Sequence, residues 1–155
     1  IKIRGNNMNI MFVCTGNICR SAMAEWLMKK KLQERNITDV EICSSGIYAM
    51  QGDVVADEAV EGMEEYGEDL KKHRATLTSK SNIQEMDLIL CMTSSHKQNL
   101  INTYPNLVDK IYTLKEYVGI EEMDIKDPWG YTIATYRFCA AEIDKCLDKV
   151  IEKIK

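Results

Sequence analysis

The chain has 155 residues, of which 45% are hydrophobic and 28% charged, and its formal net charge is −4. This length fits one domain that buries its own core without disulfides or metal ions. The slightly acidic balance argues against nucleic acid as a partner. The sequence has no apolar run of membrane-spanning length and no signal-peptide pattern, so we expect a cytoplasmic protein with no membrane partner.

Residues 1–7 precede the first methionine and are interpreted as a leader or tag, which leaves residues 8–155 as the domain. The cysteines are scattered, with no close pair of the kind that binds zinc, so we expect neither a metal site nor a disulfide framework, and no cofactor. Four of them are interpreted as small buried hydrophobic residues. These are Cys43, Cys91, Cys139 and Cys146.

Short apolar runs alternate with helical patterns along the chain. The predicted strands are residues 9–14, 40–44, 87–92 and 110–113, and the predicted helices are 21–35, 53–66, 79–85, 94–104 and about 132–153. The apolar residues of the last helix recur in steps of three and four, which predicts one stripe packed on the sheet. Buried strands that alternate with helices predict a single α/β domain, with a four-stranded parallel sheet and helices on both faces.

The first predicted strand ends in the sequence VCTGNICRS, where Cys14 is followed by a turn and then by a helix. Gly16 and Asn17 tolerate the left-handed backbone conformations that such a turn requires. The turn directs backbone N–H groups inward and has a helix N-terminus behind it, so its natural ligand is an oxyanion. The segment therefore predicts a phosphate-binding loop after the first strand.

The side chains around this loop are suited to the hydrolysis of phosphate esters. Arg20 offers a planar, permanently charged pair of donors to two phosphate oxygens. The same positive potential stabilises a thiolate at Cys14, which makes this residue the candidate nucleophile. The leaving oxygen needs a proton, and Asp127 in the segment DPWG is the candidate general acid, with Pro128 stiffening the loop and Trp129 as an apolar wall.

The sequence resembles the low-molecular-weight protein tyrosine phosphatase family from residue 8 onward. The resemblance rests on VCTGNICRS after a strand, CSSG after the second strand, His73-Arg74-Ala75, DLILCM as the third strand, and DPWG near the C-terminus. His73 is interpreted from the residues alone as a loop or capping residue. No metal takes part in the hydrolysis that the resemblance implies.

The resemblance implies roles for individual residues. Cys14 would be the nucleophile, Arg20 the clamp on the transition state, and Asp127 the acid of the first step and base of the second. Asn17 would hold the loop in shape, Ser21 would stabilise the thiolate, Ser44 would bond to the loop, and Cys19 would capture oxidised Cys14 as a reversible disulfide. The implied phosphate- and substrate-binding residues are Thr15, Gly16, Asn17, Ile18, Cys19, Ser21, Ser44 and Trp129.

The substrate class stays open at this stage, because the bacterial branch of the family includes protein arginine phosphatases as well as tyrosine phosphatases. Arginine-directed members carry threonine where this chain has Ile18, which favours protein phosphotyrosine as substrate, with phosphoarginine as the alternative. An arsenate reductase is disfavoured because Cys91 has no cysteine soon after it, and a phosphocysteine carrier because it needs neither Arg20 nor Asp127. The expected partners are phosphorylated proteins and inorganic phosphate or a similar oxyanion, bound by a monomer.

Overall fold

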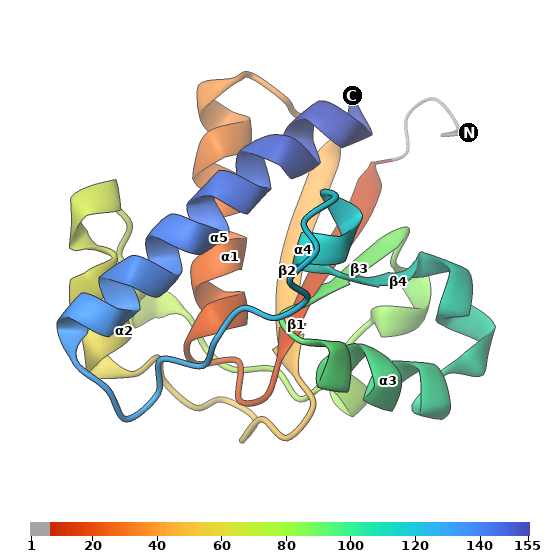
Figure 1. The fold of residues 1–155 in the computed structure, drawn as a ribbon, viewed down its shortest axis with the longest axis horizontal. Helices are drawn as coiled ribbons and strands as arrows, with labels where there is room; N and C mark the ends of the chain where they lie inside the picture. Colours follow the sequence, from red (N-terminus) through yellow and green to blue (C-terminus); the bar gives the residue numbers. More distant parts are fainter. Residues whose placement is uncertain (1–6) are drawn as a thin grey trace.

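A parallel sheet forms the centre of the fold in the computed structural model, which describes residues 7–155 (Figure 1). The strands lie in the order β2-β1-β3-β4, and every neighbouring pair is parallel. They are β1 (Met8–Cys14), β2 (Val40–Gly46), β3 (Leu88–Cys91) and β4 (Ile111–Thr113). The predicted fold class is confirmed. Most of the predicted leader, residues 1–6, lies outside the described residues.

Helices cover both faces of the sheet. They are α1 (Arg20–Glu34), α2 (Asp57–Gly62), α3 (Ser94–Thr103), α4 (Leu114–Tyr117) and α5 (Ile133–Ile154). Along β1 the side chains alternate between the faces. Ile10 and Phe12 belong to the core shared with α1 and α5, whereas Met11 and Val13 join the core beneath α3. Figure 1 shows α1 and α5 stacked on one side of the sheet and α3 on the other.

Two of the predicted helices are wrong in extent or type. Residues 79–85 form two separate 3-10 turns, Thr78–Lys80 and Ile83–Glu85, instead of a helix. The Ser81 hydroxyl donates to the Thr78 carbonyl, a local bond that competes with helix continuation. The predicted helix over residues 53–66 is reduced to α2 and a 3-10 turn, because the residues before α2 pair instead with the segment at Arg74.

The apolar stripe of α5 is buried as predicted, but it packs mainly against α1 and α2 instead of directly on the sheet. The reason is that α1 already covers this face of β1 and β2, so α5 forms an outer layer. Among the cysteines interpreted as buried, Cys91, Cys139 and Cys146 are buried, whereas Cys43 is only half-buried. None of the helices in residues 7–155 is long and apolar enough to span a membrane.

The sheet order determines where the loop after β1 lies. The chain leaves β1 toward β2 on one side, and β3 flanks β1 on the other, so the end of β1 is the point where the strand order reverses. In the parallel register Cys14 lies beside Gly46 and Val13 beside Cys91. The loop of residues 14–20, called the Cys14 loop below, is therefore surrounded by the segments that follow β2 and β3.

Candidate active site

The Cys14 loop turns through a left-handed residue. Asn17 has a φ of 57°, a conformation that asparagine tolerates better than most residues, and it is fully buried. At this turn the backbone N–H of Asn17 points back to Cys14, with 3.3 Å between the nitrogen and Sγ. The loop thus folds around the sulfur that ends β1.

The Asn17 side chain uses both its amide nitrogen and its amide oxygen in hydrogen bonds. Its amide nitrogen donates to the hydroxyls of Ser21 at 2.8 Å and Ser44 at 2.9 Å. Its oxygen Oδ1 accepts the backbone N–H of Thr76 at 2.9 Å, and because an N–H only donates, this contact fixes the orientation of the amide. The left-handed turn is therefore held by groups from α1, β2 and the segment before β3.

A close backbone contact supports the same loop from β2. A Cβ atom built on Gly46 would lie 2.6 Å from the Thr15 carbonyl oxygen and 2.7 Å from the Asn17 nitrogen, so only glycine fits there. The residues after Gly46 then donate to the loop: Ile47 N–H to the Cys14 carbonyl at 3.0 Å and Tyr48 N–H to the Thr15 carbonyl at 2.9 Å. The loop lies directly on the end of β2.

The Cys14 sulfur lies among hydrogen-bond donors. Ser21 Oγ is 2.9 Å from Cys14 Sγ. Since Ser21 accepts from Asn17, its own hydroxyl proton is available to the sulfur, with the Ser45 carbonyl a longer alternative at 3.3 Å. The N-terminus of α1 begins at Arg20 and carries no side-chain cap, so its dipole and free N–H groups add positive potential.

Arg20 connects the Cys14 loop to the loop of residues 125–130, called the Asp127 loop below. Its guanidinium is buried, donates through Nη1 to the Ile125 carbonyl at 2.9 Å, and places Nη2 3.6 Å from Asp127 Oδ2. Ile125 is itself tied to the end of β3, because its N–H donates to the Met92 carbonyl at 2.7 Å. The arginine is therefore fixed on one edge while its other donors remain near the mouth of the site.

The Asp127 carboxylate is exposed, in contrast to Arg20. Its side chain retains 53% of its accessible surface, and Oδ1 accepts the backbone N–H of Trp129 at 3.0 Å. This local turn, together with Pro128, orients the carboxylate without burying it. Trp129 is also exposed, so its ring forms a wall at the entrance.

A pocket of about 270 Å³ opens between the two loops. Three residues named in the sequence interpretation, Asn17, Ser21 and Ser44, are absent from its lining. Asn17 belongs to the Cys14 loop, and its side chain bonds to Ser21 and Ser44, which support the loop from behind. The pocket is lined by Cys14, Thr15, Gly16, Ile18, Cys19, Arg20, Asp127 and Trp129. A thiol, a guanidinium and a carboxylate thus share one cavity, a combination that can transfer a phosphoryl group to sulfur and protonate the leaving group.

The sequence reasoning missed that both histidines of the chain contact the Cys14 loop. His73 caps the 3-10 turn Leu70–Lys72, as interpreted from the sequence. Its Nε2 atom lies 3.1 Å from the Asn17 carbonyl oxygen. On α3, the Nε2 atom of His96 lies 2.9 Å from the Thr15 hydroxyl, and its Nδ1 atom lies 3.0 Å from the Thr93 hydroxyl. Burial lowers the pKa of both, that of His96 to about 4. No local sequence signal marks these long-range contacts.

The comparisons with known proteins agree with this geometry. A sequence model described as low molecular weight phosphotyrosine protein phosphatase matches residues 9–155. A protein-arginine-phosphatase from Geobacillus stearothermophilus is 36% identical over 94% of this chain and 95% of its own.

Solved structures show the same similarity. The crystal structure of a low molecular weight protein tyrosine phosphatase from T. tengcongensis is 42% identical in sequence and has a TM-score of 0.89. The match covers 95% of this chain and 99% of the chain in that structure. The arginine phosphatase YwlE, in a mutant with a phosphorylated active-site serine, is 35% identical with a TM-score of 0.89, over 95% of each chain.

Proposed function

The chain belongs to the low molecular weight phosphotyrosine protein phosphatase family, and from this premise we propose that it hydrolyses protein phosphotyrosine through a phosphocysteine formed on Cys14. The observation that carries the proposal is the shared pocket, where Cys14, Arg20 and Asp127 converge from the end of β1, the start of α1 and the loop before α5. Residues 8–155 form the proposed phosphatase domain, acting as a monomer.

The proposed reaction has two steps. The Cys14 thiolate attacks the phosphorus while Arg20 and the backbone N–H groups of the loop bind the phosphoryl oxygens, and Asp127 gives its proton to the leaving oxygen. Water then attacks the phosphocysteine, with Asp127 taking the proton of that water. The related YwlE structure with a phosphorylated active-site serine supports a phosphoenzyme of this kind.

The substrate preference rests on two apolar groups that line the pocket. Ile18 and the exposed ring of Trp129 give a phenyl ring apolar contact. A guanidinium can also stack on Trp129, but it gains little from the aliphatic Ile18. Phosphoarginine remains the second candidate because a relative named protein-arginine-phosphatase matches nearly the whole chain. Both candidate reactions use the same loop and the same chemistry. They differ only in the phosphorylated side chain that must enter the pocket.

Two comparisons with variants test both levels of the proposal. Wild type and Cys14→Ser are compared on p-nitrophenyl phosphate, where the variant is expected to lose turnover but to retain oxyanion binding. Wild type and Ile18→Thr are then compared by kcat/KM on phosphotyrosine and phosphoarginine peptides. Lost apolar contact typically changes discrimination by about 10–200-fold, so Ile18→Thr should move the ratio toward phosphoarginine by that order. A wild type that already prefers phosphoarginine would overturn the substrate proposal alone.

We also propose that Cys19 protects Cys14 against irreversible oxidation. Both line the same pocket, and burial raises the pKa of the Cys19 thiol to about 12, so it stays protonated and is itself a poor target for peroxide. Peroxide would oxidise Cys14 to a sulfenic acid, which the Cys19 thiol would convert to a Cys14–Cys19 disulfide with release of water. Dithiothreitol should restore wild-type activity, whereas Cys19→Ser should accumulate sulfinic acid on Cys14, as detected by mass spectrometry.

A further inference from the structure

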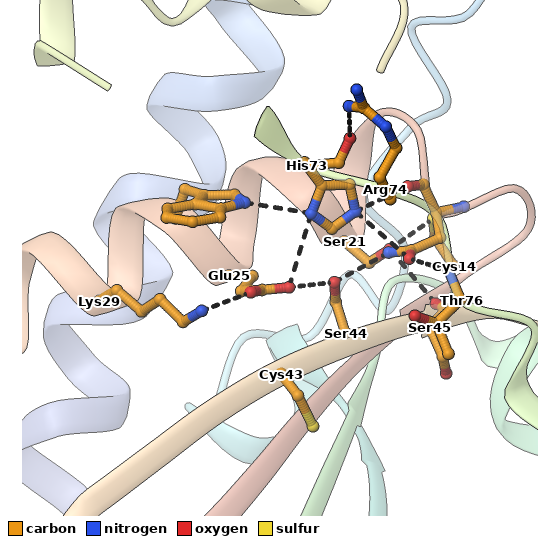
Figure 2. A network of polar contacts seen from close by, with 12 residues as sticks. Cys14, Ser21, Glu25, Lys29, Cys43, Ser44, Ser45, His73, Arg74 and Thr76 are labelled. Atoms are coloured by element: carbon orange, nitrogen blue, oxygen red, sulfur yellow. Dashed lines mark hydrogen bonds and ion pairs between the residues drawn. The ribbon is translucent and has the colours of Figure 1, made fainter. Parts of the chain in front are cut away.

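A buried imidazole lies directly behind the Cys14 loop (Figure 2). Nε2 of His73 is 3.1 Å from the Asn17 carbonyl oxygen and 3.3 Å from Asn17 Oδ1. Both are acceptors, since the Thr76 N–H already identifies Oδ1 as the oxygen of the amide. Nε2 therefore carries a proton, and His73 donates to the residue with the left-handed backbone.

The second ring nitrogen of His73 faces an indole. Trp26 Nε1 lies 3.1 Å from His73 Nδ1, and an indole N–H is a donor only, so Nδ1 must present its lone pair. The two rings meet nearly edge to face, at an interplanar angle of 86°. Together the two contacts specify one state of the ring, which is neutral with its proton on Nε2.

We infer that Trp26 is a positioning residue of the proposed phosphatase: its indole N–H holds His73 in the neutral state that donates to Asn17, and so keeps the Cys14 loop in shape as the pH falls. A proton on Nδ1 would set two donors against each other at 3.1 Å. The contact with Trp26 must therefore break before His73 can become charged. The inference deepens the proposed function, since it assumes that this loop binds the phosphoryl group.

The charges around His73 explain why this contact matters. Glu25 Oε1 on α1 lies 3.8 Å from Nδ1, too long for a hydrogen bond but close enough to attract a proton there. Lys29 of α1 binds Glu25 and lies 4.4 Å over the Trp26 ring, and Arg74 follows His73 in the chain. Burial lowers the pKa of His73, Glu25 and the Asn17 carbonyl raise it, and Lys29 and Arg74 lower it.

The substitution Trp26→Phe removes the N–H donor and keeps an aromatic ring at the same place. His73 Nδ1 is then free to take a proton and pair with Glu25. It can also take the other neutral tautomer, in which the Nε2 lone pair would face two oxygens of Asn17. Either change weakens the contact that supports the left-handed turn.

The test is ¹⁵N NMR of the histidine rings in the full chain from about pH 5 to about pH 8, the range in which histidine ordinarily titrates. In wild type we expect His73 to stay neutral with its proton on Nε2. In Trp26→Phe we expect the pKa of His73 to rise above its wild-type value, so that the ring takes up a proton at a higher pH. His96, the other histidine, is the internal control: burial lowers its pKa to about 4, so it should stay neutral over this range in both proteins. A wild-type His73 with its proton on Nδ1, or charged at neutral pH, would overturn the inference without any variant.

Activity supplies the second readout. In Trp26→Phe, kcat/KM on p-nitrophenyl phosphate should fall below the new pKa of His73 and return toward the wild-type value above it. An unchanged pH profile, with a changed tautomer, would show that Trp26 controls the ring but not the loop, and would overturn the positioning role. If wild type has no phosphatase activity, the proposed function fails, while the NMR result still decides the state of His73.

Discussion

The Cys14 loop and the Asp127 loop are held in opposite ways although they face the same pocket. In the Cys14 loop, Asn17 is fully buried and bonded to α1, β2 and the segment before β3. In the Asp127 loop the carboxylate is half-exposed and bonded to the Trp129 N–H, with Arg20 3.6 Å away. The fold thus fixes the centre of the Cys14 loop, whereas in the Asp127 loop it holds Ile125 and leaves the carboxylate of Asp127 held mainly by its own short turn.

The difference fits the separate tasks of the two loops. Groups that bind a transferring phosphoryl must be in place before the reaction, because reorganising them would cost part of the barrier reduction. A general acid that gives up its proton in the first step and takes one from water in the second must be reached by that water, so a half-exposed carboxylate suits the role proposed for Asp127. The comparison therefore predicts that changes in the Asp127 loop affect catalysis with little effect on folding, whereas changes beneath the Cys14 loop affect both.

The largest effect is expected from Asp127→Asn. The amide keeps an oxygen that can accept the Trp129 N–H, so the turn should survive, but it cannot supply a proton. We expect kcat on phosphotyrosine peptides to fall by about 10²–10⁴-fold, the usual contribution of a general acid, and the free energy of unfolding to stay near that of wild type. Steady-state kinetics and urea unfolding measure the two quantities.

A substrate with a good leaving group provides the control for Asp127→Asn. p-Nitrophenol needs less help from an acid than the phenol of tyrosine, so the loss should be smaller on p-nitrophenyl phosphate. Equal losses on both substrates would contradict the acid role, and a large loss of stability would contradict the contrast between the loops.

A smaller effect is expected from Gly46→Ala, which inserts a methyl group beneath the Cys14 loop. The new Cβ would meet backbone atoms of Thr15 and Asn17 at under 3 Å, and neither can move without shifting the loop. We expect the free energy of unfolding to fall by about 1–3 kcal/mol, the usual cost of overpacking, together with a loss of kcat/KM. Urea unfolding and assays on p-nitrophenyl phosphate measure both.

Gly16→Ala is the matched control for stability, because it adds the same methyl group to the same loop in open space. A Cβ on Gly16 would lie 3.5 Å from the Ile18 side chain, an ordinary contact. The unfolding free energy of Gly16→Ala should therefore stay close to that of wild type. If Gly46→Ala is as stable as Gly16→Ala, the Cys14 loop is not held by β2 as described.

The sequence was sufficient to predict what is local in these two loops. Cys14 and Arg20 lie in one continuous segment between a strand and a helix, and Asp127 lies in a turn with Pro128, so pattern and chemistry were enough. The supports of the Cys14 loop were not predictable in this way. Thr76, His73 and His96 are remote in sequence and come to the loop only through the packing of the segments around β3. The helix predicted over residues 79–85 is wrong because a local side-chain bond, from the Ser81 hydroxyl to the Thr78 carbonyl, competes with the helix.

At neutral pH the smallest effect concerns His96, which joins α3 to the Cys14 loop through Thr15. Burial, with Arg20 nearby, lowers the pKa of His96 to about 4, against an ordinary value of 6.5. Between about pH 6.5 and about pH 4, His96 is therefore protonated in the unfolded chain but neutral in the folded chain. The free energy of unfolding has its full value, as far as His96 is concerned, above about pH 6.5. It decreases as the pH falls through this window, by at most about 1.4 kcal/mol per pH unit.

The variant His96→Gln isolates this contribution, because glutamine can still bond to Thr15 but does not titrate in this range. Urea unfolding of both proteins at several pH values gives the difference in unfolding free energy, and the carboxylates common to both cancel in that difference. We expect wild type to lose stability faster than His96→Gln as the pH falls below about 6.5. Parallel curves would mean that His96 takes its proton equally well in the folded state, and that its side of the Cys14 loop is more open to water than the buried side at His73.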